Sequence, residues 1–132
     1  MSFDLEDVPA RFQPAVNATL DAVGAGEGHL AVEVVDEERI RELNREHRGR
    51  DAATDVLSFP VDAEETPGPV EFGDVVLCPE YCVSEVEAVV HGVLHLCGYD
   101  HETDRGEMFD LQDRIVNGLG IEPRMTVEAE IE

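Results

Sequence analysis

The sequence contains no lysine, and its nine basic residues, all arginine, stand against 31 acidic residues, so the formal net charge is −22 at pH 7. A surface this poor in positive charge should repel phosphate, which argues against binding nucleic acid through a general basic face. Acidity of this kind can accompany disorder, but 42% of the residues are hydrophobic and recur in periodic blocks, which indicates a folded domain. We interpret the acidity as an adaptation to a saline cytoplasm, where salt screens the repulsion between carboxylates.

Long apolar runs and paired cysteines are missing too. No stretch approaches the roughly 20 residues of a membrane span, and the first residues lack the basic and apolar regions of a signal peptide. We therefore expect a cytoplasmic protein without a membrane partner.

The cysteines, Cys78, Cys82 and Cys97, are an odd number and make no disulfide framework. One Cys-x-x-x-Cys pair is weak evidence for a metal site, so we expect small buried thiols.

Three of the five histidines lie close together in the sequence. His91 and His95 are four residues apart, so a helix would project both rings from one face. Gly98 suits the left-handed turn that often ends a helix, and such a turn can bring His101 back toward the other two. A single histidine on an apolar face would favour an ordinary buried helix. Three in this arrangement favour one zinc ion per chain, with a fourth position left to water.

The same histidine spacing occurs in the metzincin proteases, where a glutamate directly after the first histidine activates the metal-bound water. Here that position is Gly92, which has no side chain to take a proton. Peptide hydrolysis by that mechanism is therefore not expected.

Residues 91–101 read His-Gly-Val-Leu-His-Leu-Cys-Gly-Tyr-Asp-His. This run resembles the signature of the YbeY family of metal-dependent endoribonucleases, which act in ribosomal RNA maturation. Upstream stretches match the family in the same order: Asn44–Asp51 running into Thr54–Pro60, and Gly73–Glu80. Three motifs in the family's order are far more specific than one alone.

Periodicity predicts four short strands alternating with four helices in a single domain over residues 1–132, of α+β or α/β class. The predicted strands are 2–6, 29–35, 54–61 and 73–78; the predicted helices begin at Pro9, after an N-cap at Asp36, at Val83 and at Asp104. Residues 62–72 are predicted to be a loop, and the acidic tail 121–132 to be loosely held. The resemblance implies a sandwich-like α+β fold with a mixed, mostly four-stranded sheet and about four to five helices.

Five of the nine arginines fall within twelve residues, which gives this window a charge of +3 after its two glutamates are counted: Arg39, Arg41, Arg45, Arg48 and Arg50. A solvated helix face is an adequate explanation for Arg39 and Arg41. Arg48 and Arg50 lie in a Gly-containing turn after the helix, and arginine's planar fork suits phosphate. We expect Arg45, Arg48 and Arg50 to bind substrate.

The resemblance implies a single-strand-specific endoribonuclease that matures small-subunit (16S) ribosomal RNA and acts in ribosome quality control. Its partners would be single-stranded or ribosomal RNA and the small ribosomal subunit, with no DNA. On this interpretation His91, His95 and His101 hold zinc, which lowers the pKa of bound water from about 15.7 to roughly 7. Arg48, at the position of the family's functional arginine, would act catalytically by stabilising charge on the phosphate.

Two further residues of the same run, Tyr99 and Asp100, lie between the second and third histidines. Asp100 either orients a ligand histidine or is an ordinary turn aspartate. Tyr99 is expected to be a wall of the pocket rather than a catalyst.

Two other functions stay open: a zinc hydrolase of another bond, and a non-catalytic ribosome-assembly factor with a structural zinc. The arginine cluster argues against a neutral substrate for the first. The second needs a fourth protein ligand. The nearest candidate, Cys97, lies about 200° around the helix from His95 and so points away.

The acidic surface generates a test of its own. If it is tuned to salt, the melting temperature should rise between dilute buffer and molar potassium chloride, because salt screens repulsion among many carboxylates. Scanning calorimetry across that range measures the trend. A melting temperature that stays flat or falls would contradict an adaptation to a saline cytoplasm.

Overall fold

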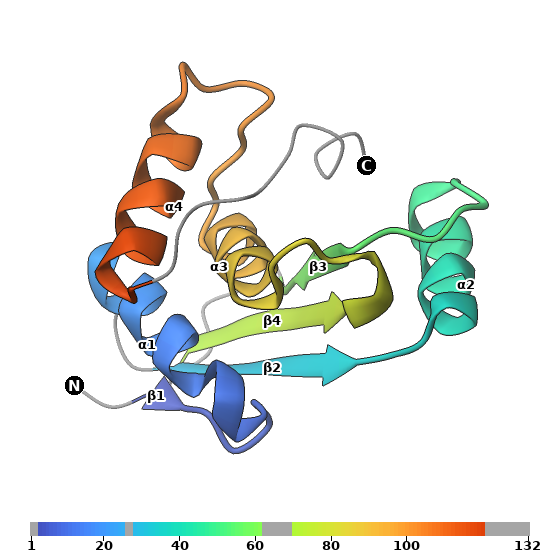
Figure 1. Cartoon of the computed structure of the whole chain (residues 1–132), viewed down its shortest axis with the longest axis horizontal. Coiled ribbons are helices and arrows are strands. Elements are labelled where there is room, and N and C mark those ends of the chain that lie inside the picture. Colours follow the sequence, from blue (N-terminus) through green and yellow to red (C-terminus); the bar gives the residue numbers. More distant parts are fainter. Residues whose placement is uncertain (1–2, 26–27, 62–69, 121–132) are drawn as a thin grey trace.

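The structure is a computed structural model that describes residues 3–25, 28–61 and 70–120. Over these residues, four α-helices and two short 3₁₀ helices surround one four-stranded sheet (Figure 1). The strands are β1 (Phe3–Asp4), β2 (Gly28–Val34), β3 (Val56–Pro60) and β4 (Val70–Leu77). The helices are η1 (Ala10–Phe12), α1 (Gln13–Ala22), α2 (Glu37–Arg48), η2 (Pro79–Tyr81), α3 (Glu85–Leu96) and α4 (Glu107–Gly118).

The sheet is mixed, with the strand order β1-β2-β4-β3. β1, β2 and β4 run parallel, and β3 runs antiparallel to β4. β1 pairs through only two residues, so the three longer strands form the body of the sheet. The α+β fold and mixed sheet expected from the sequence are confirmed. Of the described strands, β3 lies at the edge opposite β1, which becomes important for the site.

α3 is the central helix, with sheet on one side and helices on the other. One core cluster joins it to the sheet and α1, and a second joins it to α1 and α4. This explains why its residues Ala88–Val90 and Val93–Leu94 are all buried. On the opposite face of the sheet, α2 packs Ile40 and Leu43 against Leu57 of β3.

The helix ends follow from local sequence signals. The Asp36 carboxylate accepts a hydrogen bond from the Arg39 N–H at the start of α2, as the predicted N-cap requires. Ser84 caps α3 in the same way through the Glu87 N–H. α4 begins at Glu107 and not, as was predicted, at Asp104. The Asp104 carboxylate lies ahead of the helix and accepts hydrogen bonds from the N–H groups of Gly106 and Met108.

The start of β4 was predicted wrongly. The strand begins at Val70, whereas the predicted loop over residues 62–72 placed its start at Gly73. The register with β2 shifts between His29 and Leu30, so Phe72 is an extra residue on β4, and such a bulge breaks the two-residue period. The rest of the predicted loop, 62–69, and the tail 121–132 lie outside the described residues.

The three cysteines are free, and they are buried or half-buried as predicted. Burial raises the pKa of Cys82 to about 12 and that of Cys97 to about 11, so both thiols stay protonated near neutral pH. None of the helices within the described ranges has the length and apolar character needed to cross a bilayer.

Gly92 sets how closely α3 approaches the sheet. A Cβ atom on Gly92 would lie 2.9 Å from Cγ1 and 3.2 Å from Cγ2 of Val75 on β4, closer than side chains pack. The Ser58 hydroxyl of β3 donates to the Gly92 carbonyl at 3.0 Å, which ties the helix to the sheet at the same point. The helix therefore sits directly on β3 and β4, with its histidines beside the edge strand.

Gly92→Ala should destabilise the fold by about 1–3 kcal/mol, because the new methyl overpacks a filled interface. Gly118→Ala is a matched control: Gly118 also lies in a helix, but nothing is within 4 Å of its Cβ position. That change should be neutral or stabilising by up to about 1 kcal/mol, since alanine favours helix. Urea unfolding measures both. The cost of Gly92→Ala should shrink in a Val75→Ala background, and equal costs in both backgrounds would contradict the packing argument.

Candidate metal centre

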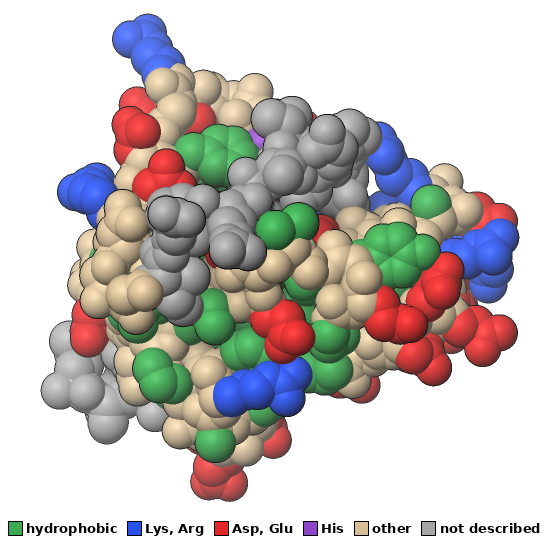
Figure 2. Space-filling model, in the orientation of Figure 1, with side chains coloured by type: hydrophobic (Ala, Val, Ile, Leu, Met, Phe, Trp, Pro, Cys, Tyr) green, Lys and Arg blue, Asp and Glu red, His purple; other side chains and the backbone are tan. Residues whose placement is uncertain are grey.

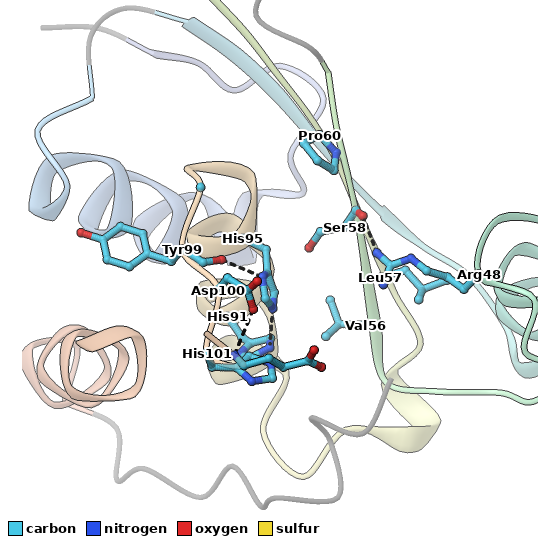
Figure 3. Close-up of a pocket in the computed structure, with 12 residues that line it drawn as sticks. Arg48, Val56, Leu57, Ser58, Pro60, His91, His95, Tyr99, Asp100 and His101 are labelled. Carbon is cyan, nitrogen blue, oxygen red and sulfur yellow. Dashed lines mark hydrogen bonds between the residues drawn. The ribbon is translucent and has the colours of Figure 1, made fainter. Parts of the chain in front are cut away.

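The three histidines converge at the C-terminal end of α3 (Figure 3). His91 and His95 project from the helix, and the left-handed Gly98, with φ of 97°, turns the chain so that His101 faces them. One nitrogen from each ring can be chosen so that all three lie within 4.8 Å of one another. Among the described residues, this is the group of histidine, cysteine or carboxylate side chains that could hold a metal ion.

Hydrogen bonds on the outer nitrogens orient the first two rings. The Nδ1 of His95 donates to the Tyr99 carbonyl at 2.9 Å, and a carbonyl can only accept, so this nitrogen carries the proton. The Nδ1 of His91 lies 2.9 Å from Oε1 of Gln112 on α4. The Gln112 amide nitrogen donates to the buried Glu87 carboxylate at 3.4 Å, which fixes Oε1 as the atom facing His91.

The Nε2 atoms of His91 and His95 are the ring nitrogens that face each other inside the group, 3.2 Å apart. A tetrahedral zinc ion with Zn–N bonds of 2.0–2.1 Å would hold two ligand nitrogens about 3.3 Å apart. The donor set therefore fits a divalent metal, and the outer hydrogen bonds are those typical of metal-binding histidines.

Within the described part of the chain, the metal group contains three protein ligands and not four. Cys97, the candidate for a fourth, packs against the core cluster between α3 and the sheet and does not line the histidine cleft. Three ligands are typical of a catalytic metal site, in which the remaining position is open.

The histidines form one wall of a cleft of about 350 Å³, within the size range of ligand-binding sites. The facing wall is Arg48, the last residue of α2, together with the edge strand β3 (Figure 3). The Arg48 guanidinium donates to the Ser58 carbonyl at 2.8 Å, so one bond holds it at the cleft. The structure thus brings Arg48 and the three histidines together.

The other arginines of the cluster lie elsewhere. Arg45 lines a separate surface hollow on α2, and Arg50 is exposed beyond the helix; neither lines the histidine cleft. Arg39 pairs with Glu42, and Arg41 pairs with Asp51 at 2.8 Å, where its guanidinium lowers the pKa of that carboxyl. Acidic side chains are spread over the face shown in Figure 2, and several of its arginines lie over α2.

Tyr99 and Asp100 both line the cleft, in different ways from each other. Tyr99 contributes its backbone, whose carbonyl holds His95, while its ring points away from the histidines and packs on the α1–α4 core (Figure 3). The Asp100 carboxylate accepts a hydrogen bond from the Glu102 N–H at 3.0 Å. This bond is typical of an ordinary turn aspartate, one of the two roles considered for Asp100.

Comparison with known proteins agrees with this geometry. The family model described as Endoribonuclease YbeY matches residues 1–120. The chain belongs to the YbeY family. An Endoribonuclease YbeY from Alkalilimnicola ehrlichii is 44% identical over 130 residues, covering 85% of this chain and 78% of the relative. Another, from a Sulfurihydrogenibium species, is 44% identical over 110 residues, covering 70% and 71%.

The solution structure of TM1509 from Thermotoga maritima is similar to this YbeY fold. It is 33% identical, with a TM-score of 0.50, over 80% of this chain and 75% of that one. The sequence identity and the shared fold agree with the assignment from the family model.

Sequence reasoning missed Gln112 and Glu87. A signal was present, because Gln112 lies four residues from both Met108 and Val116 on an otherwise buried helix face. A buried amide or carboxylate needs a hydrogen-bond partner. What the sequence lacked was the identity of that partner, since α3 and α4 meet only in the folded chain.

Alanine at His91, His95 or His101 should each lower bound zinc well below one ion per chain, because two imidazoles hold the ion far less tightly than three. His47→Ala is the control: His47 is exposed and meets the Phe59 ring edge to face, with ring centroids 5.1 Å apart, outside the metal group. Elemental analysis after dialysis measures the content. Full zinc in the His101→Ala protein would remove that residue from the site.

A second experiment tests the hydrogen bond between His91 and Gln112. Gln112→Met keeps the buried volume but cannot accept from His91, so zinc affinity measured by chelator competition should fall about 10- to 100-fold. Unchanged affinity would mean that Gln112 is only a packing residue.

Proposed function

We propose that this YbeY chain is a zinc-dependent endoribonuclease of the cytoplasm that cleaves single-stranded RNA. Its cellular role would be the maturation of 16S ribosomal RNA and ribosome quality control, with the small ribosomal subunit as partner. The observation that carries the proposal is the arrangement of the cleft. Three oriented imidazoles on one wall face an anchored arginine on the other.

In this proposal His91, His95 and His101 hold one zinc ion. When bound, such an ion supplies a Lewis acid that neutralises phosphate charge and makes water a nucleophile near neutral pH. Arg48 holds the phosphate: one guanidinium N–H donates to Ser58, and the others remain to bind non-bridging oxygens. Arg45 and Arg50 lie outside the cleft, so they would contact phosphates farther along the RNA.

The cleft offers little to a peptide or neutral substrate. Position 92, where a protease of similar spacing has its glutamate, faces Val75 and Ser58 in the sheet. A side chain there would enter the core and not the cleft, so α3 supplies no general base at this position. A guanidinium at the cleft wall suits a charged phosphodiester better than an amide bond.

Arg48→Ala should reduce cleavage of a fluorescent single-stranded RNA by one to three orders of magnitude, about the loss expected for one charge-stabilising donor. Zinc content should stay the same. Arg48→Lys should restore only part of the rate, because an ammonium cannot both hold the Ser58 carbonyl and present a planar fork.

The matched control is Arg41→Ala, since Arg41 lies on the same helix but pairs with Asp51 outside the cleft. It should cleave at nearly the wild-type rate. If Arg48→Ala cleaves as fast as the control with its zinc bound, the arginine has a structural role and the proposed site is wrong.

A further inference from the structure

Among the described strands, β3 pairs only with β4, and its other edge faces the cleft. Toward β4, the Cys78 N–H donates to the Asp55 carbonyl at 2.8 Å, and the Val61 N–H donates to the Phe72 carbonyl at 3.4 Å. In an antiparallel pair, residues two apart along a strand point their backbone groups the same way. The backbone N–H and C=O groups of Leu57 therefore point toward β4, as those of Asp55 and Val61 do.

The intervening residues of β3, Val56, Ser58 and Pro60, turn their N–H and C=O groups away from β4. The bond from Arg48 to the Ser58 carbonyl agrees with this direction, since Arg48 approaches from outside the sheet. All three residues line the histidine cleft.

Counting hydrogen bonds between described residues, one of these three positions keeps a backbone donor. The Val56 N–H donates to the Asp55 carboxylate at 2.8 Å, and Pro60 has no N–H. Across the described length of β3, the Ser58 N–H is therefore the one outward donor without such a bond. It points to the same side as the Ser58 carbonyl, next to the Arg48 guanidinium.

We propose that the Ser58 backbone N–H and the Arg48 guanidinium together bind the non-bridging oxygens of one substrate phosphate, opposite the three histidines. This inference rests on the proposed function and names a second donor for it. The Ser58 donor belongs to a sheet strand that α3 braces through the hydroxyl bond to Gly92. A donor fixed in this way needs little reorganisation when charge develops on the phosphate.

The same edge is poorly suited to a peptide. A peptide strand that extends a sheet needs donors and acceptors alternating along the edge. At β3 the first donor is already bonded to Asp55, and the third does not exist at Pro60. A single N–H beside a guanidinium matches a phosphate, which takes two donors at one point.

Amide hydrogen exchange on the zinc-loaded protein tests the contact directly. The probe is a single-stranded 2′-O-methyl RNA, which presents phosphates but lacks the free 2′-hydroxyl. The Ser58 amide should exchange quickly in the free protein and at least tenfold more slowly with the probe. Leu57 should exchange slowly in both states, because its N–H belongs to the ladder with β4.

The second test removes the donor alone. An ester in place of the Leu57–Ser58 amide, made by chemical ligation, replaces the N–H by an oxygen. It should lower the cleavage rate by roughly 10- to 1,000-fold and weaken binding of the 2′-O-methyl probe, with zinc content unchanged. The matched control is an ester at Asp55–Val56, which removes an N–H that donates to Asp55.

Combining the ester with Arg48→Ala should cause less loss than the product of the two separate losses, because both donors act on one phosphate. The proposal is overturned if the Ser58 ester binds the probe and cleaves as the control ester does. It is equally overturned if an extended peptide, and not the RNA probe, protects the Ser58 amide.

The two proposals fail separately. If the unmodified protein binds the probe but cleaves no RNA, the proposed function is wrong, while Ser58 protection still decides the phosphate contact. If the ester disturbs the fold, exchange on the unmodified chain decides alone.

Discussion

The close contact between α3 and the sheet at Gly92 is the constraint on which the site depends. Because Gly92 has no side chain, the helix rests on Val75 and accepts a hydrogen bond from Ser58. This places the histidine face of α3 beside the edge of β3 that pairs with none of the described strands. The same glycine that removes a protease-like glutamate from the helix therefore brings the two walls of the cleft together.

Charge is distributed so that a very acidic chain still has one arginine, Arg48, at the wall of the histidine cleft. With 31 acidic residues against nine arginines, most of the surface repels RNA. Several arginines are neutralised by partners, as Arg41 is by Asp51. Arg48 instead donates a hydrogen bond to the neutral Ser58 carbonyl. Because a carbonyl carries no net charge, the positive charge of Arg48 is not neutralised by this contact. The local geometry of the cleft, and not the net charge of the chain, is the basis for the proposed phosphate contact.

Much of the fold could be predicted from local sequence. Asp36 and Gly98 indicate where helices begin and end, because capping and left-handed turns are properties of a few adjacent residues. The spacing of His91 and His95 places both on one helix face for the same reason. The start of β4 was missed because Pro67, Gly68 and Pro69 indicated a loop as far as Phe72, and the bulge at Phe72 gives the first residues of the strand no regular alternation.

The sequence by itself determined most of the helices and strands, though not where β4 and α4 begin, and it determined the three histidines and the cluster that contains Arg48. Only the tertiary structure decided that Gln112 holds His91, that Arg48 and not Arg45 lines the cleft, and which β3 amide faces it. These facts depend on contacts between residues distant in sequence and on strand register. A one-residue change of register would exchange the inward and outward groups of β3 without altering a single local signal.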